Sequence, residues 1–230
     1  MSAFLRFCLK FITSSFEYCL NLFNLAASAV FRGDGVHRGN GQPVLLIPGF
    51  LIGDISMAVI KFWLKRMGYS AYPSNASVMG ACPYKTAQCL EQKLDDIYHR
   101  TGQPVIVIGY SLGGAIARFL ARKYPAKVGQ VITIGTPPLS DIKVDPFLYK
   151  LFQKFNPECI SRCDCEMVRG LRNPNPVFET LVYSKDDETV LSAVSEVVTN
   201  GSYHQVSGSH GGLVVNPEVY KIIALCLSRS

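Results

Sequence analysis

One serine in this chain has neighbours that could turn it into a nucleophile. The segment Gly109-Tyr110-Ser111-Leu112-Gly113 has the pattern G-x-S-x-G and lies between the apolar run PVIVI and the helical run AIARFLARKY. A serine at such a sharp strand-to-helix turn adopts strained backbone angles, and its hydroxyl is exposed at the end of the strand. The amide groups and positive dipole end of the following helix point at the same place. We therefore predict that Ser111 is a nucleophile rather than part of a structural Gly-Ser turn.

A serine hydroxyl reacts only when a base removes its proton, so a histidine and a group that orients it are required. The chain has four histidines. His37 lies in a turn-rich stretch and His99 among the charged residues of a predicted helix, so we expect both to be solvated. His210 lies in the sequence GSHGG, in a loop free to curl back over the strand ends. We predict that His210 is the base, with His204 as the alternative.

The carboxylate that orients the histidine is expected at the end of a strand, between the serine and the histidine in the chain. The strand-like run FETLVYS is followed by Lys185 and then by Asp186, Asp187 and Glu188. Spacing alone does not separate these three acids. At least two of them are expected to belong to an ordinary solvated turn.

Short apolar runs alternate with helical patterns along the chain. Such runs are typical of strands buried on both faces, and the alternation indicates a parallel sheet with helices on both sides. Strands are predicted at residues 44–48, 69–74, 104–111, 128–136 and 178–184, and helices at 57–68, 85–102, 112–125 and 217–228. The predicted fold class is α/β.

The order serine, acid, histidine, together with several segments, resembles the α/β-hydrolases. The matching segments are PVLLIPGF, GYSLGG, VITIGTP, YSKDDETV and GSHGGLVVNP, within residues 41–227, and they look most like the compact bacterial lipase and esterase branch. The resemblance implies the α/β-hydrolase fold: a mostly parallel central sheet, helices on both faces, a small lid insertion and, here, an extra N-terminal helix. In that branch the acid is the D of a Y-S-x-x-D-x-x-V pattern. This pattern falls on Asp187 and leaves Asp186 as the second candidate.

The resemblance also implies an oxyanion hole made by two backbone amides, those of Phe50 and Leu112. Such donors stabilise the negative charge that develops on the carbonyl oxygen of a tetrahedral intermediate. Many relatives have His-Gly where this chain has Pro48-Gly49. Because that change keeps the amide of Phe50, we expect it to alter the shape of the substrate site more than catalysis.

A segment of about forty residues, 137–177, separates two predicted core strands, and in this superfamily such insertions form a lid. Five of its apolar residues recur at helical spacing: Phe147, Leu148, Leu151, Phe152 and Phe155. Two interpretations fit this spacing. The helix packs into the core, or it forms a hydrophobic wall for an acyl chain.

The first 35 residues differ from the domain predicted over residues 36–230. Apolar side chains between Leu5 and Val30 recur at the spacing of one helix face, and polar ones gather on the other. A Gly-rich linker, RGDGVHRGNGQP, follows. Residues 1–31 therefore read as an amphipathic helix, which either packs on the domain or lies on a membrane surface with its basic residues near anionic head groups.

A secretory signal is a third interpretation of this helix, with Ala27-Ser28-Ala29 as the cleavage site. However, Glu17, Asn21 and Asn24 interrupt the apolar region that a signal or a membrane-spanning helix needs. We expect a cytoplasmic protein, with membrane association or export as the alternatives.

Composition narrows the classes of partner. Of the 230 residues 48% are hydrophobic, which indicates a globular chain with a sizeable core. The net charge of +6 is spread without any run of more than two basic residues, so nucleic-acid binding is not expected. The sequence does not indicate an oligomeric state.

The eight cysteines lack the paired spacing of a zinc site, and no metal or cofactor is implied. We expect mostly free thiols. A single disulfide, between Cys82 and Cys89 or among Cys159, Cys163 and Cys165, would fit an exported protein.

Together these features predict a serine hydrolase that cleaves carboxylic esters, with a small-molecule or lipid ester as its partner. Ser111 would attack, His210 would move the proton, Asp187 would hold the imidazole, and water would release the acyl group. An acyltransferase or thioesterase shares the first half-reaction and stays an alternative. A non-catalytic binding protein would be expected to lack one of the three residues.

Overall fold

The computed structural model describes residues 3–80, 82–136, 144–157, 175–190 and 200–228, with side chains from residue 12 onward. Within these ranges six strands form one sheet in the order β2-β1-β3-β4-β5-β6, and every neighbouring pair is parallel. The strands are β1 (Pro43–Ile47), β2 (Ser70–Pro73), β3 (Val105–Tyr110), β4 (Val128–Ile134), β5 (Glu179–Ser184) and β6 (Gly201–Val206). The predicted α/β class and parallel sheet are confirmed.

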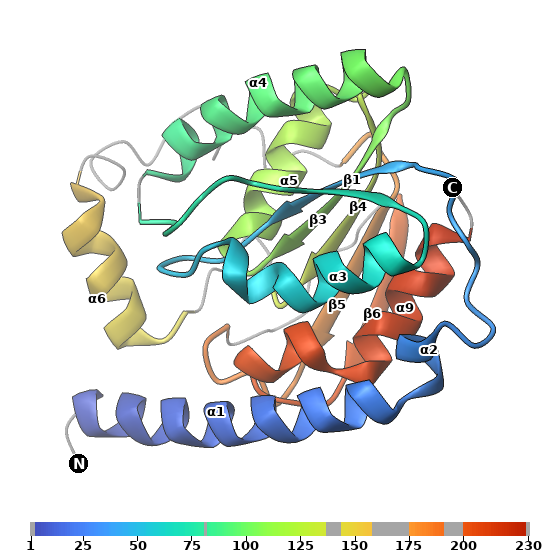
Figure 1. Ribbon diagram of the computed structural model, residues 1–230. Coiled ribbons are helices and arrows are strands. Elements are labelled where there is room, and N and C mark those ends of the chain that lie inside the picture. The colour runs from blue at the N-terminus through green and yellow to red at the C-terminus, as the bar shows by residue number, and fades with distance from the viewer. Residues whose placement is uncertain (1–2, 81, 137–143, 158–174, 191–199, 229–230) are drawn as a thin grey trace.

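Helices cover both faces of this sheet (Figure 1). Alternate residues of β1 show the division, since Val44 and Leu46 pack in one core and Leu45 and Ile47 in the other. The first core is closed by α2 (Ala29–Arg32), α3 (Ala58–Arg66), η2 (Gly211–Val215) and α9 (Pro217–Leu227), and the second by α4 (Pro83–Thr101) and α5 (Leu112–Lys123). Burial on both faces explains why these strands read as continuous apolar runs.

The sixth strand, β6, was not predicted from the sequence. Its residues, GSYHQV, are mostly polar, and only Val206 is buried. An edge strand pairs on one side only and keeps much of its surface in water, so the apolar signal of the inner strands is missing. His204 belongs to this strand.

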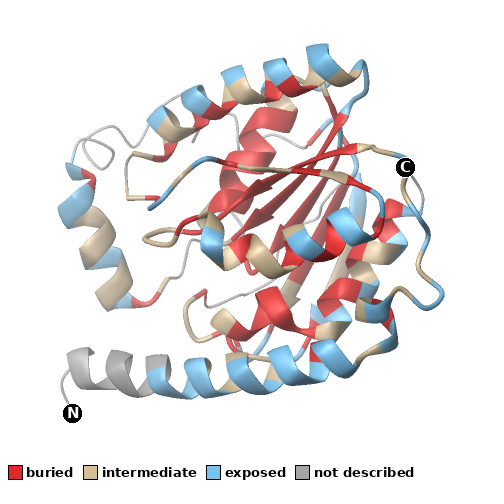
Figure 2. Ribbon diagram, in the orientation of Figure 1, coloured by how far each residue is buried: buried red, intermediate tan, exposed pale blue. Residues whose placement is uncertain are grey.

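The N-terminal helix α1 (Ala3–Ala27) lies along one end of the molecule, where it contacts η2 and α9 and comes close to α6 (Pro146–Phe155) (Figure 1). The side of α1 that faces the protein is mixed, because the polar side chains of Ser14, Glu17 and Asn21 lie there together with Tyr18. The described apolar side chains on its outer side are strongly exposed, as Figure 2 shows along the helix: Ile12 63%, Phe16 73%, Leu20 49% and Phe23 74%. Leu25 near its end is fully buried and anchors the helix to the first core.

Three cysteines, Cys19, Cys89 and Cys226, carry free thiols. The pairing of Cys82 with Cys89 considered from the sequence is therefore wrong. Cys82 is disulfide-bonded, and its partner lies outside the described side chains. The cluster of Cys159, Cys163 and Cys165 also lies outside the described residues.

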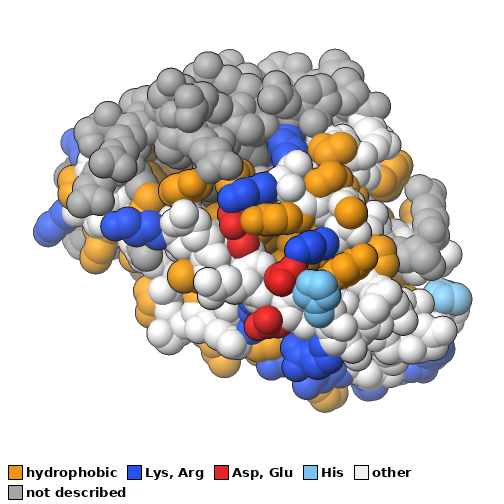
Figure 3. Space-filling view, turned by 90° about the horizontal axis from the view of Figure 1, so that it is seen from above, with side chains coloured by type: hydrophobic (Ala, Val, Ile, Leu, Met, Phe, Trp, Pro, Cys, Tyr) orange, Lys and Arg blue, Asp and Glu red, His pale blue; other side chains and the backbone are white. Residues whose placement is uncertain are grey.

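Charged groups on the face seen in Figure 3 are mixed in sign, with Lys and Arg beside Asp and Glu. Ion pairs link α4 to neighbouring segments, since Lys123 binds Glu91 at 2.8 Å and Lys127 binds Asp95. Among the described helices, none combines the length and apolar character needed to cross a membrane.

Candidate active site

Ser111 occupies the turn between β3 and α5 in a conformation that few residues other than glycine adopt, with φ 54° and ψ −123°. The surrounding backbone holds it from two sides. Its N–H donates to the carbonyl of Ile134 at 2.8 Å, and its carbonyl accepts from the Gly114 N–H and the Thr136 hydroxyl, both at 3.0 Å. Strain of this kind persists where neighbouring contacts over-determine the geometry, and it concentrates at functional sites.

The glycines of the G-x-S-x-G pattern are required by close backbone approach. A Cβ on Gly109 would lie 2.4 Å from the carbonyl oxygen of Gly113. A Cβ on Gly113 would lie 2.2 Å from the carbonyl oxygen of Ile47 at the end of β1. Both distances are far below van der Waals contact, so α5 can start directly behind the serine only with glycine at these positions.

His210 is hydrogen-bonded to Asp187, three residues beyond the end of β5. The Nδ1 atom of His210 lies 2.7 Å from Oδ2 of Asp187, and because the carboxylate accepts, Nδ1 carries the proton. The other oxygen of Asp187 accepts from the N–H groups of Thr189 at 2.9 Å and Val190 at 2.7 Å. Only 4% of Asp187 is exposed, so its position is fixed by three donors away from bulk water.

The imidazole of His210 lies between two neighbours. The ring of Tyr110 is 5.0 Å away between centroids, and its hydroxyl donates to the His210 carbonyl at 3.0 Å. A Cβ on Gly135 would lie 3.2 Å from Nδ1, so the residue that follows β4 also lies close to the imidazole. Burial, reinforced by the charges of Asp187 and Glu188, raises the pKa of the Tyr110 phenol well above its usual value, so this hydroxyl stays a donor.

The loop after β1 lies directly beside the serine. A Cβ on Gly49 would lie 3.0 Å from Cβ of Ser111, and Leu51 adopts a positive φ of 61° in the turn that follows. Leu112 is the first residue of α5, so its amide has no partner within the helix. Within the described part of the chain, neither this amide nor that of Phe50 has a hydrogen-bond acceptor. Both groups are thus available to an oxygen atom beside Ser111.

A cavity of about 300 Å³ opens at this point, with Ser111 and His210 in its wall. The rest of the wall is largely apolar and comes from several elements: Phe50, Ile52, Leu148, Val214 and, from α1, Ser14 and Tyr18. Such an apolar pocket with a few polar groups that converge is typical of a small-molecule site.

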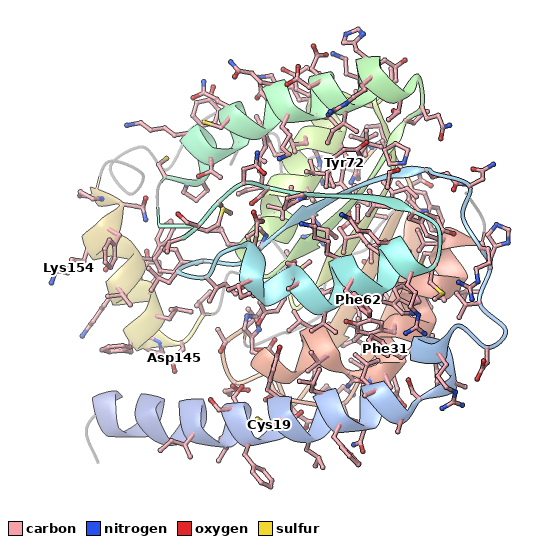
Figure 4. The ribbon with its side chains drawn as sticks, in the orientation of Figure 1. Cys19, Phe31, Phe62, Tyr72, Asp145 and Lys154 are labelled. Atoms are coloured by element: carbon pink, nitrogen blue, oxygen red, sulfur yellow. The ribbon has the colours of Figure 1, made fainter. Side chains whose placement is uncertain are left out.

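The helix α6 forms one side of this cavity. Asp145, labelled in Figure 4 at its start, accepts from the Phe147 N–H at 2.9 Å and caps the helix. No residue of α6 is buried, so the interpretation of its apolar spacing as core packing is wrong. Phe152 packs edge-on against Phe50 with centroids 5.2 Å apart, and Phe155 lies 6.5 Å from the same ring.

Of the residues predicted from the sequence, the structure brings Ser111, Asp187 and His210 together with the loop of Phe50. His204, the alternative base, lies on β6, where its Nε2 is 3.2 Å from the Ser202 hydroxyl. Its side chain is not part of the cavity wall.

Sequence reasoning missed the groups that bind the loop of His210. Asp186 accepts from the Gly208 N–H and Glu188 from the His210 N–H, each at 3.2 Å, so these acids are not simply a solvated turn. Glu17 on α1 accepts from the Ser209 N–H. The only sequence signal for Glu17 was that it is the sole charge between Phe11 and Phe31.

No group of three or more His, Cys, Asp and Glu side chains that could hold a metal ion occurs among the described residues.

Comparisons with known proteins agree with this architecture. The family model for the alpha/beta hydrolase fold matches residues 96–164. A monoacylglycerol lipase from Paleococcus ferrophilus is similar with a TM-score of 0.59 and 16% identity, over 85% of this chain and 99% of that one. A lipase-esterase related protein from Clostridium acetobutylicum gives 0.58 and 17%, over 84% and 97%. Lipase B from Aspergillus fumigatus gives 0.60 and 16%, over 86% of this chain and 56% of its own.

Proposed function

We propose that this chain, which has the α/β-hydrolase fold, is a serine hydrolase of carboxylic esters. One observation carries the proposal. Ser111, in its strained turn, shares a cavity with His210, whose Nδ1 is bound to the buried carboxylate of Asp187. A nucleophile, a base and a group that orients the base are the parts that acyl transfer through serine requires.

The proposed reaction has two halves. Ser111 Oγ attacks the carbonyl carbon of the ester while Nε2 of His210 takes its proton, and the amides of Phe50 and Leu112 stabilise the oxyanion. The intermediate collapses to an acyl-enzyme as His210 gives the proton to the leaving alcohol. Water, deprotonated by His210, then hydrolyses the acyl-enzyme. Asp187 holds the imidazole and stabilises its positive charge in both halves.

The apolar wall favours an ester with an acyl chain. Phe50, Ile52, Leu148 and Val214 offer few polar partners, so binding there depends on the burial of apolar surface. The neighbour from Paleococcus ferrophilus is named as a monoacylglycerol lipase, which fits a lipid-like substrate.

Replacement of the nucleophile tests the proposal. We expect Ser111→Ala to lower kcat on p-nitrophenyl esters by at least about a thousandfold, since the mutant keeps only the oxyanion donors and the binding cavity. Ser56→Ala is the matched control, because Ser56 lines the same cavity but donates its hydroxyl to the Gly53 carbonyl. Undiminished turnover in Ser111→Ala would contradict the proposal. A series of acyl chain lengths defines the preferred acyl group. Product analysis with competing alcohols separates hydrolysis from acyl transfer.

We further propose that α1 lies on a membrane surface. Its outer side exposes Ile12, Phe16, Leu20 and Phe23, while its inner side contributes Ser14 and Tyr18 to the cavity. A lipid ester at the membrane would thus be close to the site.

A cytoplasmic location stays a prediction. The disulfide of Cys82 does not favour that location, because cytosolic thiols are kept reduced.

A further inference from the structure

The polar side of α1 is bound to the loop that carries His210. Both carboxylate oxygens of Glu17 accept from the backbone N–H of Ser209, at 2.9 and 3.0 Å, across 192 residues of sequence. The Ser14 hydroxyl donates to the Ser209 hydroxyl at 3.1 Å. These contacts join the first helix of the chain to the residue directly before His210.

Glycines in this loop leave room for the side chains of α1. A Cβ on Gly208 would lie 2.6 Å from Oε1 of Glu17, and one on Gly212 would lie 2.8 Å from the same atom. A Cβ on Gly211 would lie 2.8 Å from the Ser14 hydroxyl oxygen. The Gly-rich sequence around His210 therefore fits the inner face of α1, in addition to making a turn.

Three successive amides of the loop each bind a different carboxylate. The Gly208 N–H donates to Asp186 and the His210 N–H to Glu188, both at 3.2 Å, and the Ser209 N–H between them donates to Glu17. Hydrogen bonds to carboxylates are among the stronger ones in proteins. Two of these acids follow β5, whereas Glu17 comes from α1, so the loop is held from two sides.

We propose that Glu17 is a positioning residue for His210, and that α1 is thereby part of the active site. This inference rests on the proposed function, because Glu17 can position a catalytic base only if His210 is that base. The orientation of α1 supports it. A helix that only added stability would bury its apolar face, whereas α1 turns Ser14, Glu17 and Asn21 toward the protein and leaves Phe16 and Phe23 in solvent.

Removal of the Glu17 carboxylate should act on turnover rather than on binding. In the full chain we expect Glu17→Ala to lower kcat on a short p-nitrophenyl ester by about ten- to a hundredfold, because small displacements of a catalytic group are costly. KM should stay within about twofold, since the cavity wall keeps its apolar residues. Glu17→Gln keeps one acceptor oxygen for the Ser209 N–H and should fall between wild type and Glu17→Ala.

The matched control is Asn24→Ala, a polar residue on the exposed side of the same helix. Active sites are counted by fluorophosphonate labelling, so that a loss of folded protein is not scored as a loss of kcat. Unchanged kcat per active site in Glu17→Ala overturns the inference, as does an equal loss in Asn24→Ala. Ser111→Ala is assayed beside them. If Ser111→Ala retains wild-type activity, the proposed function is wrong. If Ser111→Ala is inactive and Glu17→Ala is fully active, only the inference about Glu17 is wrong.

Discussion

Tyr110 precedes Ser111 in the chain, and its phenol is buried against His210. Burial raises its pKa well above 10, and an unfolded chain would ionise the same group near 10. The folded state then binds the proton more strongly, so its stability is complete below about pH 10 and falls as the pH rises above that value. We expect Tyr110→Phe to flatten this fall in urea unfolding followed between pH 9 and 11. Equal slopes in wild type and Tyr110→Phe would contradict the assignment.

Individual site residues differ in how far the sequence reveals them. Ser111 is marked by its own neighbours, because the strand, the glycines and the helix that shape its turn are contiguous. Spacing alone did not separate the three acids after β5, and only the family resemblance singled out Asp187. In the structure Asp187 binds the imidazole, and the other two bind backbone amides. Glu17 could not be assigned from any pattern, since its partner lies 192 residues away and a lone charge in a helix does not specify which loop it meets.

Between elements, a buried ion pair joins α5 to β5. Arg118 of α5 binds Glu179 of β5, with side chains exposed to only 5% and 2%, and Asn175 adds a hydrogen bond to the same carboxylate at 3.3 Å. Arg118→Met should lower the free energy of unfolding by about 3–5 kcal/mol, because a carboxylate is left buried without its charge partner. The double variant Arg118→Met with Glu179→Leu should recover much of that loss in urea titrations.

Lys123→Met is the control for this pair, since Lys123 binds Glu91 at the protein surface and should contribute less than about 1 kcal/mol. If the single and double variants at Arg118 and Glu179 were equally unstable, the loss would reflect packing rather than an unpaired charge.

Five of the six described strands, and the helices that pack on them, could be predicted because their signals are local. Buried parallel strands carry unbroken apolar runs, and α4 ends at Gly102 with the left-handed φ of 66° that its glycine permits. The edge strand β6 lacked that signal. The orientation of α1 was not predictable either, because amphipathic spacing says only that two faces differ. Hydrogen bonds to the His210 loop, which form only in the folded chain, decide that the polar face turns inward.

In the molecule as a whole, α1 has two sides with different neighbours. Its inner side touches the His210 loop and the cavity, and its outer side adds a row of aromatic and aliphatic groups to the surface. Phe31, in the short helix α2 that follows α1, forms an aromatic pair with Phe62 of α3, and their ring centroids are 6.3 Å apart (Figure 4). Phe62 is itself 57% exposed, so α3 also carries an exposed aromatic side chain.

Binding to lipid vesicles tests whether this surface meets a membrane. The full chain should pellet with vesicles of phosphatidylcholine and phosphatidylglycerol, and less with phosphatidylcholine alone, because its net charge is +6. The double variant Phe16→Ser with Phe23→Ser should bind at least about tenfold more weakly, since each buried aromatic side chain contributes roughly 1.5–3 kcal/mol. Phe178→Ser, at the amino end of β5, is the control for a general loss of hydrophobicity.

Hydrolysis of a short dissolved ester should stay unchanged in the double variant, because Phe16 and Phe23 point away from the cavity that Ser14 and Tyr18 line. Equal pelleting of wild type and double variant would exclude α1 as the membrane contact. The positioning of His210 by Glu17 would then be the one role still proposed for α1.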